Sequence, residues 1–408
     1  MTRTRKIALM AATACLVLGL AEARAQQGAA PQAGAGQARP AATAPRRGGG
    51  YMQLPPQDEA MLRAKHPELY VLPPVPHSYV PKKTPWGDPD LRGMWPTDSF
   101  GGMYVQHPEE MGDRVWLTPE EVKVVETNME RQRDAPAKET KAGKLGMGNW
   151  VEMTGASRRT AMIVDPRNGR LPELTPEGKR LSALGRSSWM NGQNFDWVTD
   201  FDSWDRCITR GFPASMFPFR YNNGLQILQS PGYVVINLEM IHDARIIPLN
   251  DSPRVAGTSN WMGESRGHWE GNTLVIDTDH IRPGASPLNM ATLGAHYGNT
   301  DPMSRQAHVT ERLTPIDANH ITYEMTYSDP VYWTAPFTMR VDWTRNDKYT
   351  FFEYACHEGD EQVHNYVIAN RVQRKKAKQE AAQKAAEAAS AAKPADAVVP
   401  PAAPAKKN

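Results

Sequence analysis

The sequence predicts a mainly β protein whose core is an antiparallel barrel or sandwich, joined to an irregular, proline-rich N-terminal half with short helices. Three observations lead to this prediction. Within residues 204–372, short apolar stretches alternate with period two between turn residues, as antiparallel strands do. Residues 51–96 carry many prolines, which central strands exclude. Two helix-start signals, at 118–121 and 175–177, lie before residue 204.

The first 25 residues have the features of a secretory signal peptide. Three basic residues among the first six precede an apolar run over 7–20, and the small residues Ala23 and Ala25 precede the expected cleavage site. The apolar run is shorter than the roughly 18 residues of a membrane span. We therefore predict a periplasmic or secreted protein with no membrane-inserted segment after residues 1–25 are removed.

The segment after the signal peptide is predicted to be a flexible leader over residues 26–50, because its Gln, Ala, Gly and Pro cannot bury enough apolar surface to offset the entropy of ordering. Residues 51–203 are then expected to form an extended arm and short helices packed on the core. Proline-rich stretches with scattered aromatic residues favour this arrangement.

Two helices and a strand are predicted within this arm. A threonine followed by proline and two glutamates starts a helix over 118–133, and Lys, Gly and Ala predict a linker over 134–148. The same Thr-Pro-Glu pattern at 175–177 starts a second, short helix. An apolar stretch at 159–164 predicts a short strand that a turn composition ends.

The core is predicted over residues 204–372, and turn compositions between its strands favour an antiparallel meander. A helix over 363–373 is expected to pack back on the sheet. The Ala-, Lys- and Glu-rich tail over 373–408 is predicted to be disordered or helix-prone. Seven strands are expected, at residues 225–229, 233–247, 273–277, 308–314, 321–327, 337–343 and 349–356.

The charge balance argues against nucleic acid as a partner. The chain has 47 Lys and Arg against 45 Asp and Glu, for a formal net charge of +2. Loss of the signal peptide removes more basic than acidic residues and leaves the chain nearly neutral. Binding to a phosphate backbone needs a basic face, and outside the C-terminal tail none is evident. A small-molecule partner fits better, and the oligomeric state stays open.

Two cysteines follow the signal peptide, Cys207 and Cys356, and an even pair in an exported protein predicts a disulfide bond. Closing such a loop stabilises a fold by about 4–5 kcal/mol on the chain-entropy model. The alternative is that one thiolate is a nucleophile or a metal ligand, for which the neighbouring His357 is the only local indication.

Several blocks of this sequence resemble a group of exported bacterial proteins, and the resemblance implies a location but no activity. From Trp269 onward, the strands and hairpins are also similar to lipocalin-like barrels, in which a Gly-x-Trp motif opens a strand and the barrel holds a small ligand. Those barrels carry the motif near the N-terminus, whereas here it lies at 267–269. The shared blocks are residues 88–95, 163–166, 206–207, 221–223, 239–245, 265–271 and 353–359.

Glu239 and His242 have the spacing that places two metal ligands on one face of a helix. Because residues 233–247 are predicted to form a strand, the two side chains should point to opposite faces, and no metal is predicted. His242 then ends an otherwise apolar face. It is either a core histidine held by one hydrogen bond or, if that face lines a cavity, an acid or base.

Three other groups of polar residues have both a structural and a functional interpretation. Asp243 and Arg245 lie two apart on one strand face and are expected to form an ion pair or to hold an anionic ligand group. Residues 221–223 are either a turn or a set of hydrogen-bond donors at a cavity mouth. His357 and Glu358 are either part of a corner pinned by the disulfide or part of a site.

Two functions are predicted from these features, and no cofactor is expected in either. The first is binding of a small hydrophobic or aromatic molecule in a β-barrel cavity. The missing motifs of serine hydrolases, nucleotide enzymes and zinc proteases favour this function. The alternative is a lyase or hydrolase that uses His242 or His357 with a nearby carboxylate, and the clustering of ionisable residues in two blocks favours it. The candidate catalytic residues are His242, Glu239 and His357, and the candidate ligand-binding residues are Tyr221, Asn222, Asn223, Arg245, Asp243 and Glu358.

Overall fold

The structure is a computed structural model of the chain, and it describes residues 54–98, 103–143, 152, 155–184, 195–219, 221–249, 257–283 and 303–391. The chain divides into two units, Met1–Arg46 and Arg47–Asn408, and every described residue belongs to the second. The predicted signal peptide and leader, and the end of the tail, lie outside the described residues.

The larger of two sheets is an antiparallel sheet in the order β2-β10-β9-β8-β7-β6. Its strands from β6 to β10 pair antiparallel in the order in which they follow one another in the chain, as the predicted meander requires, and β2 joins from the N-terminal half at the β10 edge. The strands are β2 (Ile163–Asp165), β6 (Glu264–Glu270), β7 (Thr273–Asp279), β8 (His308–Pro315), β9 (His320–Ser328) and β10 (Phe337–Thr344).

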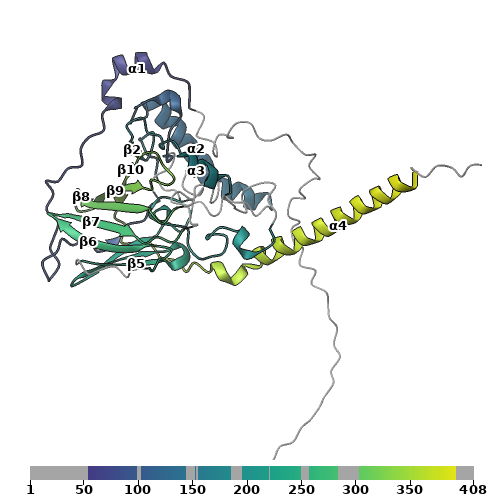
Figure 1. Cartoon of the computed structure of the whole chain (residues 1–408). Coiled ribbons are helices and arrows are strands. Elements are labelled where there is room, and N and C mark those ends of the chain that lie inside the picture. The colour runs from purple at the N-terminus through teal and green to yellow at the C-terminus, as the bar shows by residue number, and fades with distance from the viewer. Residues whose placement is uncertain are drawn as a thin grey trace, which may run out of the picture. The chain divides into compact units, whose positions relative to one another are not determined.

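The smaller sheet has the order β1-β3-β4-β5, and its β5 lies beside β6 of the larger sheet (Figure 1). Among the described residues neither sheet closes on itself, so the protein is mainly β with two antiparallel sheets, and the predicted barrel is not seen. The strands are β1 (Gly93–Met94), β3 (Leu225–Ser230), β4 (Tyr233–Leu238) and β5 (Ala244–Pro248).

The space on the inner face of the larger sheet is filled by side chains. Phe337, Met339, Val341 and Trp343 alternate along β10 and are fully buried. The ring of Trp343 stacks on that of Tyr323 in β9, with 4.5 Å between ring centroids. Together with the apolar face of the smaller sheet these residues form one core cluster, so the inner face supports packing of the two sheets.

The helices begin where the capping signals place them. Thr118 caps α2 in a capping box with Glu121, and Thr175 caps α3. The helix predicted to end at residue 133 runs to Lys141, and the C-terminal helix continues through the predicted tail to Ala391. The helices are α1 (Glu59–Lys65), α2 (Pro119–Lys141), α3 (Pro176–Ser182) and α4 (Glu361–Ala391), with 3-10 helices at Pro67–Tyr70, Glu109–Met111, Val198–Asp200, Ala214–Met216, Met240–His242 and Cys356–Gly359.

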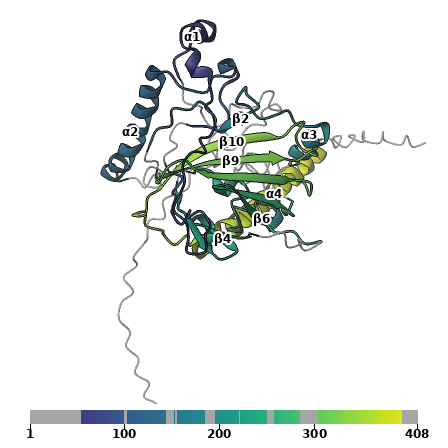
Figure 2. The ribbon, with the colours of Figure 1, turned by 90° about the vertical axis from the view of Figure 1, so that its left-hand side faces the viewer.

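In the turned view, α2 and α3 lie at opposite ends of strands β9 and β10, α2 at the left and α3 at the right (Figure 2). The α3 side is fixed by a backbone hydrogen bond from Thr175 to Tyr332 and by a bridge between Leu174 and Trp333. Of the helices in the described ranges, none combines the length and the apolar character that crossing a membrane requires.

The strand predicted over 233–247 is in fact a hairpin of β4 and β5. The chain reverses at Ile241 and His242, which have φ values of 60° and 44°. The reversal shifts the alternation, so that Arg245 and Ile247 face inward while Ile246 faces solvent. The strand predicted over 349–356 is also absent: these residues form irregular chain that leads into a 3-10 helix.

Candidate functional site

The carboxylate of Glu239, at the turn between β4 and β5, joins three segments that are distant in sequence. Its Oε1 accepts hydrogen bonds from Asn222 Nδ2 at 3.1 Å and from the Phe352 amide at 3.0 Å. Its Oε2 accepts from the Gly224 amide at 2.8 Å and from the Tyr349 hydroxyl at 2.7 Å. With four donors and 1% exposure, Glu239 is suited to a positioning role.

A second carboxylate, Glu152, lies on the other side of the same phenol. The Tyr349 oxygen is 3.5 Å from Glu152 Oε2, and the backbone N–H groups of Asn222 and Asn223 donate to Glu152. Burial raises the pKa of Glu152, and the charge of Glu239 raises it further. Burial and the hydrogen bond to Glu239 raise the pKa of the Tyr349 hydroxyl far above its usual range. Glu152, Tyr349 and Glu239 thus form a series along which a proton can be held or moved.

Four aromatic side chains pack together beside these carboxylates. Phe219 makes edge contacts with Trp204 and Tyr221, with ring centroids 5.4 Å and 4.6 Å away. Tyr354 hydrogen-bonds with Trp204 and Tyr221, and burial raises its pKa. Because Trp204, Tyr221 and Tyr354 are only partly buried, they present ring surface at the protein exterior.

A buried guanidinium completes this aromatic group. Arg210 lies 4.9 Å from the ring centroid of Phe219 and donates to the carbonyl of Phe217 at 2.8 Å. Desolvation lowers its pKa to about 9, and Tyr221 and Tyr354 counter that shift only in part. A positive charge therefore lies beneath the aromatic rings.

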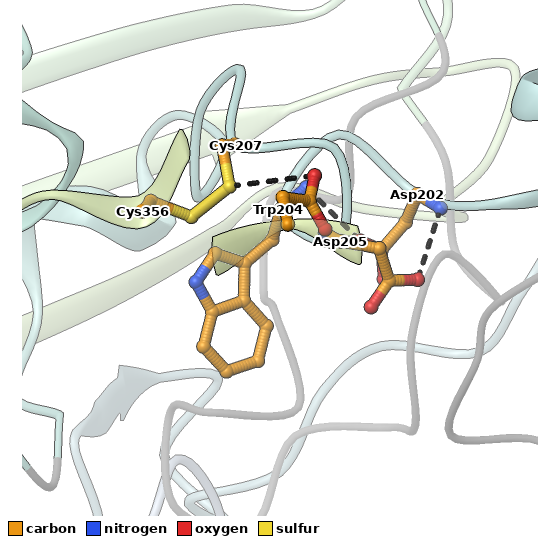
Figure 3. The surroundings of a disulfide bond; sticks show 6 residues. Asp202, Trp204, Asp205, Cys207 and Cys356 are labelled. Atoms are coloured by element: carbon orange, nitrogen blue, oxygen red, sulfur yellow. Dashed lines mark hydrogen bonds between the residues drawn. A yellow bond between two sulfur atoms is a disulfide. The ribbon is translucent and has the colours of Figure 1, made fainter. Parts of the chain in front are cut away.

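The predicted disulfide between Cys207 and Cys356 is present, with 5.8 Å between the two Cα atoms. It connects the segment after Tyr354 to the turn that carries Trp204 (Figure 3). That turn is fixed by Asp202, whose Oδ1 accepts from the amides of Trp204 and Asp205. The hydrogen bonds and the disulfide together define what we call the Glu239 corner, which comprises residues 204–210, 219, 221–224, 239–243 and 349–357 with Glu152.

Strained backbone is concentrated in the Glu239 corner. Five non-glycine residues of the described chain have positive φ, and four of them lie here. Such conformations are unfavourable for side chains with a Cβ and cluster at functional sites, where the surrounding structure enforces them. Ile241 is the clearest case, because it is β-branched. The four residues are Cys207 (53°), Asn222 (50°), Ile241 (60°) and His242 (44°).

Asp243 and Arg245 do not form the expected ion pair. Asp243 accepts a hydrogen bond from the Thr209 hydroxyl at 2.8 Å. Arg245 is 3% exposed and pairs with the equally buried Glu311 of β8, where Nη1 is 2.8 Å from Oε1. The reversal at Ile241 explains the separation, since it turns Arg245 into the space between the sheets. Arg245 is therefore a residue of the core, away from solvent.

The predicted histidines lie at the surface. His242 is exposed on the turn that buries Glu239, so its interpretation as a core histidine is wrong. His357 and Glu358 are exposed on the 3-10 helix that begins at Cys356. Within the described ranges, no group of three or more His, Cys, Asp or Glu side chains is arranged to hold a metal ion.

The sequence-based prediction missed Glu152, Tyr349 and Arg210. Tyr349 was assigned to a strand, and Glu152 follows the Gly- and Lys-rich stretch predicted as a linker. Only the fold brings Glu152 to the 221–223 block. An unusually dense set of polar residues at 221–223 is the one signal that pointed to this place.

Replacing Asp243 by Asn is expected to stabilise the fold above pH 6 by about 1–3 kcal/mol. Burial raises the pKa of Asp243 from 3.8 to about 6, and the Thr209 hydrogen bond offsets this only in part. The folded state therefore binds more protons between these pH values, and its free energy of unfolding falls as pH rises through them. Urea unfolding at several pH values measures the effect.

The stabilisation by Asp243→Asn should disappear below pH 3.8, where Asp243 is protonated in both states. Asp134→Asn, at an exposed position on α2, is the matched control and should change little at any pH. Equal stability of the Asp243→Asn variant and the unaltered chain at neutral pH would contradict the burial argument.

Comparisons of the chain with protein-family models, with curated proteins and with solved structures give no match. The arguments on function therefore come from the geometry of the Glu239 corner.

Proposed function

We propose that the Glu239 corner binds a small aromatic molecule and catalyses a hydrolysis or elimination by acid–base chemistry. The series of Glu152, Tyr349 and Glu239 carries this proposal. Both reactions need a proton donor for the leaving group, and a carboxylic acid serves at neutral pH only if its pKa is raised. Burial and the neighbouring Glu239 charge raise the pKa of Glu152, and the hydrogen bonds that it accepts offset this only in part.

Each residue of the series has a distinct proposed role. Glu239 is held in place by the four hydrogen bonds that its oxygens accept, and its charge raises the pKa of Glu152. The Tyr349 hydroxyl donates to Glu239 at 2.7 Å and lies 3.5 Å from Glu152 Oε2, so it connects the two carboxylates. In a hydrolysis, Glu152 gives its proton to the leaving oxygen, water adds to the substrate, and the proton that water loses returns to Glu152.

The substrate class follows from the aromatic side chains of the corner. The partly buried rings of Trp204, Tyr221 and Tyr354 offer stacking surface for a planar group, with the positive charge of Arg210 beneath them. His242, exposed on the same turn as Glu239, is the proposed second proton-transferring group.

The test is Glu152→Gln assayed on aryl esters and aryl glycosides. We expect kcat to fall by about 10²- to 10⁴-fold with a smaller change in KM. In the unaltered enzyme the rate should decrease as pH rises through the raised pKa of Glu152, and this limb should vanish in the variant. Glu173→Gln, at a side chain that is 85% exposed, is the control and should leave kcat unchanged.

Binding without turnover is the second candidate, and the four packed aromatic side chains favour it. In that case the aryl compounds would quench the fluorescence of Trp204 but would not be converted, and Glu152→Gln would leave their affinity within a few-fold. Turnover that is unaffected by Glu152→Gln would contradict the acid–base proposal.

A further inference from the structure

The C-terminal helix α4 carries a dense group of cations along one side. One helix face carries Arg371 and the three basic residues that follow it at spacings of three, four and seven, which are Arg374, Lys375 and Lys378. Together with two neighbouring residues of the helix they line an open depression of the surface. Residues 371–378 include five basic side chains and no acidic one, although the chain as a whole is almost neutral.

Contacts with the 195–198 segment fix this part of α4. Tyr366 packs edge-on against Phe195, with 5.5 Å between ring centroids. Arg371 donates to the Asp196 carbonyl at 3.0 Å, and Arg374 pairs with the Asp196 carboxylate. The cationic face is thus held in a defined position beside the residue that follows Asp196.

Exposed apolar side chains lie near the cations. Trp197, next to Asp196, is 63% exposed. Ile368 and Val372 precede Lys375 by seven and three residues, which places them beside it on the helix, and they are 44% and 61% exposed. Large apolar side chains left in water next to a cluster of cations mark an interaction surface.

We propose that this surface, which we call the α4 face, docks peripherally on a membrane of anionic phospholipids. The cations would meet the headgroup phosphates, while Trp197, Ile368 and Val372 enter the apolar layer just below them. Tryptophan favours this depth of a bilayer. A nucleic acid or an acidic protein surface offers the anions without a layer for the apolar side chains, so the observations favour lipid.

The test is sedimentation of the whole chain with vesicles of phosphatidylcholine alone or mixed with phosphatidylglycerol. We expect binding to the mixed vesicles, weakened by salt, and little binding to the neutral ones. The double variant Lys375→Glu/Lys378→Glu should bind at least about tenfold more weakly. Lys82→Glu/Lys83→Glu, which makes the same charge change at exposed positions far from α4 in the sequence, is the matched control.

A second pair of variants separates lipid from other anionic partners. Trp197→Ser/Val372→Ser should also weaken binding to the mixed vesicles by about fivefold or more, whereas Leu228→Ser, at another exposed apolar residue, should not. If the charge variant weakens binding but the apolar variant does not, the partner is a soluble anion or an acidic protein, and the membrane proposal is overturned. Equal binding to both kinds of vesicle, or to neither, would overturn it as well.

Discussion

Replacing Glu311 by Leu is expected to lower the free energy of unfolding by about 3–5 kcal/mol. Glu311 is fully buried between the two sheets, where it pairs with Arg245 and accepts a hydrogen bond from Tyr323 at 2.8 Å. Removing the carboxylate leaves the guanidinium of Arg245 in the core beside Ser265 and Thr278, whose hydroxyls cannot neutralise it. Urea unfolding followed by far-UV circular dichroism measures the loss.

The double variant Arg245→Met/Glu311→Leu is the matched control, because it contains the same leucine without the unpaired charge. It should recover most of the stability lost in Glu311→Leu, since a buried ion pair contributes little relative to apolar residues of similar size. A double variant as unstable as the single one would show that the cost arises from packing or from the Tyr323 hydroxyl.

Removing the disulfide with Cys207→Ser/Cys356→Ser is expected to lower the free energy of unfolding by about 4–5 kcal/mol. The two cysteines are 149 residues apart, so the bond restricts a long loop of the unfolded chain. The bond also connects two of the segments that form the Glu239 corner. We therefore expect any catalytic or binding activity to fall together with stability. Urea unfolding followed by circular dichroism measures the loss of stability.

Two comparisons control the disulfide prediction. Cys356→Ser alone should lose as much stability as the double variant, because either substitution opens the loop. Adding a reductant should destabilise the unaltered chain but leave the double variant unchanged. If the double variant and the unaltered chain unfold at the same urea concentration, the corner is stabilised without the covalent bond.

The β core was predictable where alternation of apolar and polar residues coincided with turn signals. From β7 to β10 the inward positions are apolar or aromatic, apart from a few buried polar groups. Gly271 marks the reversal between β6 and β7, and the 316–319 stretch marks the reversal between β8 and β9. The β6 strand was missed because its inward residues are Ser265 and Gly267. A Cβ at Gly267 would lie 2.8 Å from Leu249, so close packing against the smaller sheet requires glycine there.

Two other errors have identifiable causes. The reversal between β4 and β5 uses Met240, Ile241 and His242, none of which favours a turn, so the strain there is enforced by the surrounding structure. The 349–356 segment alternates like a strand, but the Phe352 amide donates to the Glu239 carboxylate in place of a neighbouring strand.

The candidate site was predictable only in part. The 221–223 and 239–243 blocks do meet, through the contacts of Glu239 with Asn222 and Gly224. Their meeting depends on β3 and β4 being adjacent, which the hairpin pattern indicated. Glu152 could not be placed, because no local pattern in the sequence tells which distant segment an isolated glutamate will contact.

The pairing of early and late segments constrains the order in which a nascent chain can fold. Met94, next to β3 in the smaller sheet, donates its amide to Asp347, which is 253 residues later. The edge strand β2 likewise has no pairing partner in the sheet until β10 has been synthesised. Such long-range contacts have a high entropic cost before they form, and they slow folding. Synthesis must therefore reach β10 before the larger sheet gains its β2 edge, whereas all strands of the smaller sheet precede residue 249.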